Sequence, residues 1–409
     1  MTDTRPTADC HTLWGGALSL YSGKVRAYLI KKGIRYREFY TGHPEFQSRV
    51  RPIVRLTVTP IVETPDGAVL QDSTEIIDAL ERALPTPSMI PATPVQRVIA
   101  RLLDAYGTEH LLLPAMHYRW AEPHRSAQLP FLQAEFGRIA YLGPDRQARN
   151  AAGATMMGYF GNLLPSIGGT PETAPAIEAA YLDLLECLDL HFQQVPYLLG
   201  GHPSIADFGF MAPLYAHLGR DPEPARLMSL RAPNVKRWIE RMNLAAIADA
   251  EYPDLPPAFP DDDQLPPTLE PVLALLFRDW TPELLANAAR YESWLREQPA
   301  VAAGLPVSVS SRRLVHPTLG PIEYPLRDCT IRRNSAPQTL WHFEQAAALA
   351  RALDDDARQR LDALLDRVGG QTAMRLQLSR PIVRRDHQLV VGEADDAAAA
   401  RENLPRTAP

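Results

Sequence analysis

The chain has little lysine, no excess of positive charge and no long apolar run, and each shortage excludes a class of protein. Of the 42 basic residues in 409, only four are lysine, which leaves 42 − 4 = 38 arginines. The formal net charge is −6. Without a basic excess, the composition excludes nucleic-acid binding through bulk electrostatics. No apolar run approaches the roughly 18 residues of a membrane helix, so we expect no membrane association.

Cysteine is also scarce. The three cysteines, Cys10, Cys187 and Cys329, are far apart and form no pair at CxxC spacing. This excludes a disulfide scaffold and a cysteine zinc cluster, and it favours a reducing compartment. Residues 1–9 are polar and lack the apolar stretch of a secretory signal. The sequence therefore predicts a cytoplasmic protein.

Proline, by contrast, is abundant, and its clusters divide the chain. There are 39 prolines, nearly twice the average share of about 5%. Four lie in residues 85–94 and seven in 253–271, so both segments are interpreted as linkers. At about 150 residues per domain, the length favours about three units. The expected units are 10–84, 95–250 and an extension, 272–392.

The first unit changes hydrophobic period repeatedly, which is typical of a small α/β domain. Strands are expected at 11–14 and 36–40, with a helix between them that ends at Gly33. A short helix is expected near 44–54. Asp66-Gly67 between two apolar runs predicts a hairpin, and Ser73 or Thr74 is expected to cap the next helix. The predicted order is β-α-β-α-β-β-α.

The second unit lacks strand patterns and shows helical periodicity at 98–103, 176–192 and 235–242, which predicts a helical domain. The extension is expected to be mixed and mainly helical. Its expected helices are 273–277, 284–294, 340–353 and 357–368, and its expected short strands are 307–309, 322–324, 376–378 and 388–391. From residue 393 the chain is rich in alanine, aspartate and proline, and we expect it to fray.

Three short segments of the first unit carry residues with chemical potential. The turn 19–25 joins a strand to a helix N-terminus, which favours an anion. A hydroxyl there can stabilise a thiolate, and lowering a thiol pKa by two units takes only about 2.7 kcal/mol. The same pattern also suits an ordinary serine N-cap. Thr59-Pro60, directly before an apolar strand, suits a cis bond or a plain trans turn. The segment 72–74 suits either an α-amino-acid grip or simple capping.

Taken together, these segments resemble the glutathione transferases. The resemblance rests on 19–26, 32–33, 59–62, 66–67 and 71–77, and on the loop and capping box in 196–208. In that box, Ser204 and Asp207 satisfy each other's backbone N–H groups at a helix start. The match covers about residues 10–250. It implies an α/β plus all-α architecture with a thioredoxin-like N-terminal domain, a helical-bundle second domain and a homodimer.

The resemblance also implies a site for reduced glutathione. Ser19 aligns with the residue that activates the thiol, with Ser22 a nearer and Tyr21 a weaker alternative. Because this position is not cysteine, thiolate stabilisation is expected rather than thiol exchange. The Thr59 backbone would pair with the cysteinyl amide, with Pro60 beside it in the binding site, and Asp72 and Ser73 would hold the γ-glutamyl end. The glycyl carboxylate would meet one of three arginines, Arg49, Arg51 or Arg55.

The implied reaction is conjugation of glutathione to a small apolar electrophile, as in detoxification. The resemblance implies a pocket for that electrophile around Tyr106, His110, Met116, Tyr118 and Trp120. Two departures from the family pattern, the longer segment 52–59 and Leu20 in place of a proline, leave other functions open. These are a non-catalytic glutathione-binding or scaffold protein and a glutathione-dependent isomerase or lyase.

The extension carries no motif that names a task. Its candidate ligands show no metal spacing, and no metal site is expected; they are His316, Glu323, Cys329 and His342. Its arginines cluster in sequence, which predicts a solvated or dimer-contacting face, or alternatively an anion site. They are Arg312, Arg313, Arg327, Arg332 and Arg333.

Overall fold

The N-terminal segment forms one four-stranded sheet with helices around it. The computed structural model describes residues 10–298, 301–310, 312 and 316–393. The strand order is β2-β1-β3-β4, in which β1 is parallel to β2 and antiparallel to β3, and β3 is antiparallel to β4. This mixed order is thioredoxin-like. The strands are β1 (His11–Trp14), β2 (Tyr36–Phe39), β3 (Ile61–Glu63) and β4 (Val69–Gln71).

Helices α1 (Leu20–Lys32), α2 (Arg51–Val54) and α3 (Ser73–Ala83) complete this unit, with a π-helical turn at Phe46–Val50. The predicted order β-α-β-α-β-β-α is confirmed. Helix α1 ends at Gly33, whose φ of 71° suits a residue without a Cβ.

The predicted cap of α3 is wrong by one residue. The N-cap is Asp72, and its carboxylate accepts from the N–H groups of Thr74 and Glu75. A carboxylate at this position reaches the second and third amides of the helix, so neither Ser73 nor Thr74 is needed as the cap.

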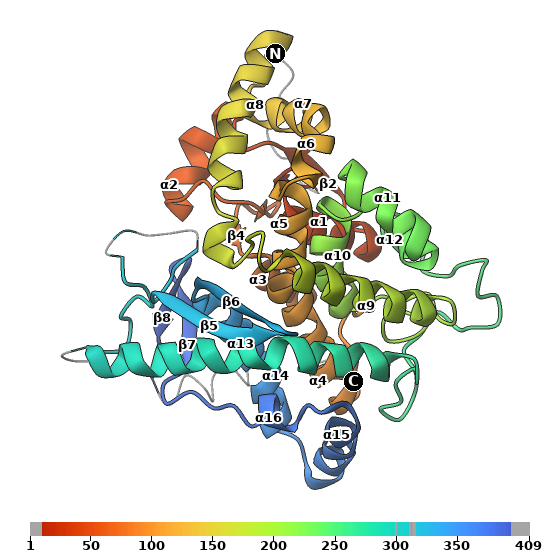
Figure 1. The fold of residues 1–409 in the computed structure, drawn as a ribbon. Helices are drawn as coiled ribbons and strands as arrows, with labels where there is room; N and C mark the ends of the chain where they lie inside the picture. Colours follow the sequence, from red (N-terminus) through yellow and green to blue (C-terminus); the bar gives the residue numbers. More distant parts are fainter. Residues whose placement is uncertain (1–9, 299–300, 311, 313–315, 394–409) are drawn as a thin grey trace.

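The middle of the chain is helical, as predicted. In the capping box of α10, the Ser204 N–H donates to Asp207 at 2.9 Å, and α7 and α8 pack together at the top of Figure 1. The elements are α4 (Pro94–Ala105), η2 (Tyr106–His110), α5 (Leu112–Trp120), α6 (His124–Ala127), α7 (Leu129–Ala140), α8 (Arg146–Gly161), η3 (Pro165–Ile167), α9 (Ala174–Phe192), α10 (Ile205–Ala216), α11 (Pro222–Arg231) and α12 (Pro233–Met242).

The extension differs most from its prediction. The two helices expected at 273–277 and 284–294 are one helix of 29 residues that passes through Pro282. Residues 376–378 are not a strand, and near 307–309 only Pro306 forms an isolated bridge, to Val390. The elements are α13 (Leu269–Glu297), β5 (Pro321–Leu326), β6 (Cys329–Asn334), α14 (Pro337–Arg351), α15 (Asp355–Val368), α16 (Gln371–Met374), β7 (Ile382–Arg385) and β8 (Gln388–Val391). Residues 394–409, expected to fray, lie outside the described part.

One hydrophobic core joins all three segments. It includes Tyr28 of α1, Phe210 of α10, Trp280 of α13 and Phe343 of α14. Helix α14 packs on α4, and α13 packs on α9. The extension is therefore built into the same interior as the helical segment.

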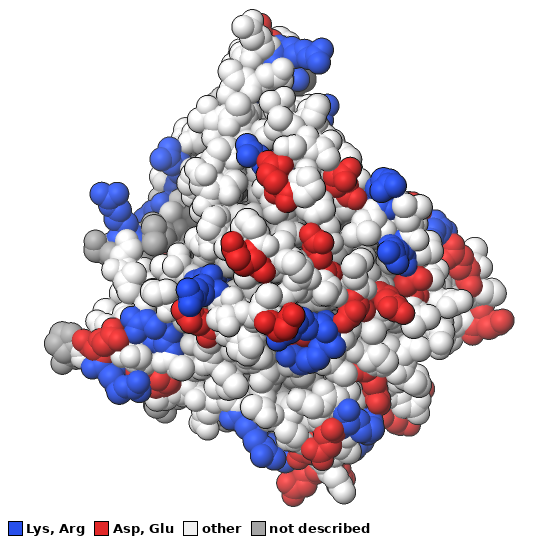
Figure 2. All heavy atoms as spheres, in the orientation of Figure 1, with Lys and Arg blue, Asp and Glu red and all other residues white. Residues whose placement is uncertain are grey.

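The visible surface carries mixed charge. Figure 2 shows acidic and basic side chains interspersed over this face. Among the described helices, none combines the length and apolar character that crossing a membrane requires.

Candidate active site at the start of helices α1 and α3

Ser19 caps helix α1 at the edge of the sheet. Its Oγ accepts a hydrogen bond from the Ser22 N–H at 3.2 Å and another from the Thr59 hydroxyl at 3.1 Å. Thr59 precedes Pro60 through a cis bond, so the structure selects the cis alternative. Ser19 is half-buried, and the first turn of α1 holds no acidic side chain to offset the positive end of the helix dipole.

The alternative hydroxyl, Ser22, is placed differently. Its side chain is fully buried, and its Oγ has no hydrogen-bond partner. A Cβ on Gly15 would lie 2.6 Å from that Oγ, so the hydroxyl packs directly against the end of β1. Ser19 is thus the more accessible of the two candidate hydroxyls.

Tyr21 lies in the first turn of α1 and remains protonated. Burial raises its pKa, and the carboxylates of Glu109 and Asp72 raise it further. A neutral phenol can donate a hydrogen bond but is no base near neutral pH.

Lys24 of α1 is buried and binds side chains of three neighbouring helices. Its Nζ lies 2.6 Å from Asp104 and donates to the hydroxyls of Thr74 and Thr108 at 2.9 and 3.0 Å. These contacts join α1 to α3, α4 and η2. Lys24 therefore has a structural role.

Asp72, at the end predicted for the γ-glutamyl group, already binds the extension. One carboxylate oxygen caps α3, and the other accepts from Gln338 Nε2 at 2.9 Å and lies 3.6 Å from Arg384 Nη1. Burial alone would raise the pKa of Asp72. The positive charges of Arg384, His342 and Lys24 outweigh burial and hold that pKa below its usual range.

Arg384 of β7 is surrounded by residues of β4 and α3 and by Trp341 of α14. Its guanidinium donates to Gln71 Oε1 at 2.6 Å and lies 3.4 Å from Glu75. It also lies over the ring of Trp341, 5.4 Å from the centroid, and its side chain is only 7% exposed. No local signal predicts this contact, because Arg384 and Asp72 are far apart in the chain. Ser73, the other γ-glutamyl candidate, is buried.

The three arginines that are candidates for binding the glycyl carboxylate lie in different surroundings. Arg49 pairs with Glu63 and Glu45 in its own domain. Arg51 is exposed and donates to Gln47. Arg55 is exposed and pairs at 3.3 Å with Asp386, in the turn between β7 and β8. The extension therefore touches both α3 and the segment after α2.

The residues expected to line the electrophile pocket are all buried. The rings of Tyr106 and His110 stack at 5.1 Å, and Tyr106 lies edge-on to Trp280 of α13 at 5.7 Å. Met116 and Trp120 belong to a different cluster of side chains. The side chains of the expected pocket are thus shielded from solvent, and Trp280 of α13 packs against Tyr106. A cavity of about 690 Å³ lies elsewhere, between α13, β5 and residues 368–372.

Consecutive residues of η2, Glu109 and His110, form buried side-chain hydrogen bonds with the extension. Glu109 accepts from His342 Nδ1 at 2.7 Å and from the Thr339 hydroxyl at 3.1 Å. His110 Nδ1 lies 2.7 Å from Glu283, whose other oxygen accepts from Arg333 at 2.9 Å.

These pairs correct the expected arginine face. Arg333 is buried, and Arg327 pairs with Asp183 and Asp279. Arg332, paired with Glu323, and Arg312 are exposed. Arg313 lies outside the described residues. Most of the described arginines of this cluster therefore form ion pairs within the chain.

Comparison with known proteins identifies the N-terminal unit. Residues 13–88 match the family model of the glutathione S-transferase N-terminal domain. No curated protein matches the chain.

Several solved structures are similar. A glutathione S-transferase of Rhodospirillum rubrum is 16% identical, with 64% of this chain and 99% of that chain covered and a TM-score of 0.36. The β-etherase LigF of a Sphingobium strain is 19% identical, with 57% and 94% covered and a TM-score of 0.36. A glutathione S-transferase of Ceriporiopsis subvermispora, in complex with glutathione, is 16% identical, with 57% and 97% covered and a TM-score of 0.38.

The assignment itself rests on the family match and on the sheet order of the described residues. Residues 13–88 form a thioredoxin-like domain of the glutathione S-transferase N-terminal family.

Proposed function

We propose that the protein is a glutathione transferase-like enzyme in which Ser19 stabilises the glutathione thiolate for attack on a small apolar electrophile. The observation that carries this proposal is the Ser19 hydroxyl, at the N-terminus of α1 and beside the cis Thr59-Pro60 bond. In a domain of this family, that position suits the sulfur of glutathione.

The hydrogen bonds of Ser19 support this role. A serine hydroxyl offers one donor and two acceptor positions. The hydrogen bonds from the Ser22 N–H and the Thr59 hydroxyl both use acceptor positions of Ser19. The O–H is therefore free to donate to an anion, and the dipole of α1 adds to its effect. A charge-assisted hydrogen bond of this kind lowers the pKa of a bound thiol.

The other parts of the site follow the same proposal. The Thr59 backbone would pair with the cysteinyl unit, and Asp72 and Ser73 would hold the γ-glutamyl end. We further propose a cytoplasmic homodimer that acts in detoxification. Light scattering after size exclusion tests the dimer directly.

The test is a rate comparison with a chlorinated nitrobenzene as electrophile. Ser19→Ala is expected to lower the conjugation rate at least about tenfold, because a hydrogen bond to a charged group contributes about 1.5–3 kcal/mol. Ser22→Ala is the matched variant, since it removes a hydroxyl one turn away. If glutathione binds and Ser19→Ala leaves the rate unchanged, the assignment of Ser19 is wrong.

A second candidate function is a non-catalytic scaffold. The contacts of Asp72 favour it, because Gln338 and Arg384 of the extension already use the carboxylate that would hold glutathione. Titration calorimetry separates the two candidates. Absence of heat at millimolar glutathione would support the scaffold, and saturable binding would support the enzyme.

A further inference from the structure

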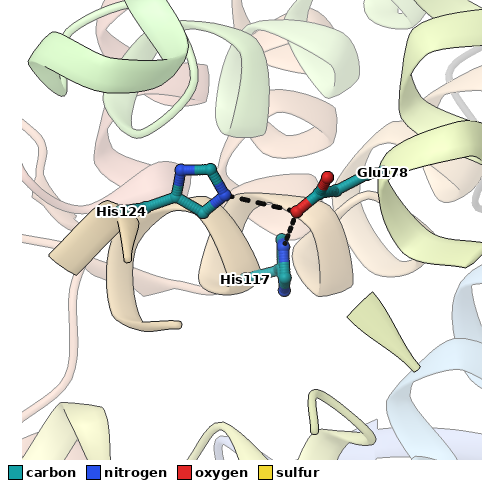
Figure 3. Close-up of side chains that lie close together, drawn as sticks. All are labelled: His117, His124 and Glu178. Atoms are coloured by element: carbon teal, nitrogen blue, oxygen red, sulfur yellow. Dashed lines mark hydrogen bonds and ion pairs between the residues drawn. The ribbon is translucent and has the colours of Figure 1, made fainter. Parts of the chain in front are cut away.

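We propose that His117, His124 and Glu178 bind one divalent transition-metal ion where helices α5, α6 and α9 meet. Glu178 Oε1 lies 2.9 Å from His117 Nε2 and 3.3 Å from His124 Nε2. The three donor atoms all lie within 4.8 Å of one another. Figure 3 shows both imidazoles converging on the same carboxylate oxygen.

The spacing of the donor atoms suits a zinc-type ion. Zn–N and Zn–O bonds of about 2.0–2.1 Å in a tetrahedron place neighbouring donor atoms about 3.3 Å apart. The two measured distances are close to this value. Two imidazoles and one carboxylate are ligands for Zn²⁺, Co²⁺ or Ni²⁺ rather than for Mg²⁺ or Ca²⁺, which prefer oxygen.

Metal binding requires neutral imidazoles and an ionised carboxylate. An ion would replace the two hydrogen bonds that Glu178 Oε1 makes with His117 Nε2 and His124 Nε2. His117 Nδ1 is buried and has no hydrogen-bond partner. When Nε2 gives its lone pair to the ion, the ring proton is carried by this Nδ1.

The three side chains of the cluster differ in their exposure to solvent. The side chain of His117 is 1% exposed, that of His124 is 20% exposed and that of Glu178 is 39% exposed. The ring of Tyr118 lies 4.8 Å from that of His124 and 5.3 Å from that of His117, so it restricts both imidazoles. A solvent-facing carboxylate leaves an entry path and a fourth position for water, as in three-ligand zinc sites.

Without a metal, the same residues would form a hydrogen-bonded triad in which both imidazoles donate to Glu178. Glu178→Gln separates the two roles. An amide oxygen still accepts hydrogen bonds, whereas loss of the negative charge removes most of the attraction for a divalent ion. None of the three residues belongs to the proposed glutathione site, so the two proposals stand or fall separately.

The experiment uses the full, untagged, metal-stripped chain, titrated with Co²⁺ by visible absorption and with Zn²⁺ by calorimetry. We expect one ion per chain and visible d–d bands from a four- or five-coordinate Co²⁺ site. His124→Ala and Glu178→Gln should weaken binding more than about 100-fold, beyond the 10- to 100-fold that follows loss of an outer partner.

Two variants serve as controls and should bind like the wild type. Glu122→Gln removes the same charge from an exposed carboxylate beside α6, and His43→Ala removes an imidazole from the N-terminal domain. Circular dichroism confirms that each variant is folded. No saturable binding by the wild type, or equal affinity in Glu178→Gln, overturns the proposal. Equal loss of affinity in the controls and in the cluster variants also overturns it.

Discussion

The two helix N-caps of the candidate glutathione site hold very different partners. Ser19, at α1, receives hydrogen bonds from Ser22 and Thr59, both in the N-terminal domain. Asp72, at α3, also binds Gln338 and Arg384 of the extension. The cap proposed for the sulfur end is therefore built locally, whereas the cap proposed for the γ-glutamyl end depends on the last part of the described chain.

This difference matters because Arg384 supplies a positive charge where glutathione would bring its ammonium group. The carboxylate of Asp72 is already neutralised by a guanidinium that is 7% exposed. A buried pair is costly to break by removing one partner, because the other charge stays desolvated. In the proposed glutathione site, the described part of the extension thus occupies the carboxylate at one end and does not hydrogen-bond Ser19 at the other.

The largest expected effect is that of Asp72→Ala on stability. It removes one of the two carboxylates beside the buried Arg384, so that only Glu75 remains, and it removes the cap of α3. We expect the free energy of unfolding to fall by about 3 kcal/mol. Urea unfolding followed by near-UV circular dichroism measures this loss. A loss below about 1 kcal/mol would mean that the contact is only a surface pair.

The contribution of the Asp72 charge should depend on pH. Its folded pKa lies below the unfolded value, near 3.9. The stabilisation is therefore complete above that unfolded pKa and is lost as the pH falls through the lower folded pKa. Asp72→Asn keeps a capping oxygen but carries no charge. Its stability deficit relative to the wild type should shrink as the pH falls below about 4. A deficit that stays constant into acid would contradict the charge pairing.

Removal of Arg384 tests the competition itself, given the proposed function. Arg384→Gln frees the Asp72 carboxylate, and we expect glutathione affinity to rise about tenfold, which corresponds to about 1.4 kcal/mol. Calorimetry at low salt measures the change. Arg385→Gln, on the same hairpin but exposed, removes an equal charge and should not reproduce the effect. A weaker affinity in Arg384→Gln would instead make Arg384 part of the binding site.

A smaller effect is expected at the other cap. Ser19→Ala removes one N-cap and should cost about 1 kcal/mol. Hydrogen exchange sharpens the contrast with Asp72. Asp72→Ala should accelerate exchange in β7 and β8, whereas Ser19→Ala should leave those strands protected. Faster exchange in both variants would show that the two ends are coupled.

The smallest effect is expected at the outer contact of the hairpin. The side chains of Arg55 and Asp386 are 63% and 57% exposed, and exposed ion pairs contribute little. Arg55→Ala should change stability by no more than about 0.5 kcal/mol in a thermal melt. A larger loss of stability would show that Arg55, rather than Arg384, holds the β7–β8 hairpin against the N-terminal domain.

The predictable features all have local causes. Gly33 ends α1 because it adopts a left-handed conformation, and Asp66-Gly67 turns the chain between β3 and β4. The capping box of Ser204 and Asp207 spans only three residues. Strand β6 was missed because Arg333 is one of its inward-facing residues, and a buried charge disrupts the apolar alternation that identifies a strand.

The sequence by itself determined the element order of the first domain, the helical nature of the second and the position of Ser19 at a helix start. Only the tertiary structure decided that Asp72 binds Gln338 and Arg384, and that His117, His124 and Glu178 meet. The physical reason is range. Turns, caps and amphipathic faces are set by neighbours a few residues apart, whereas a buried charge finds its partner only when distant segments pack into one core.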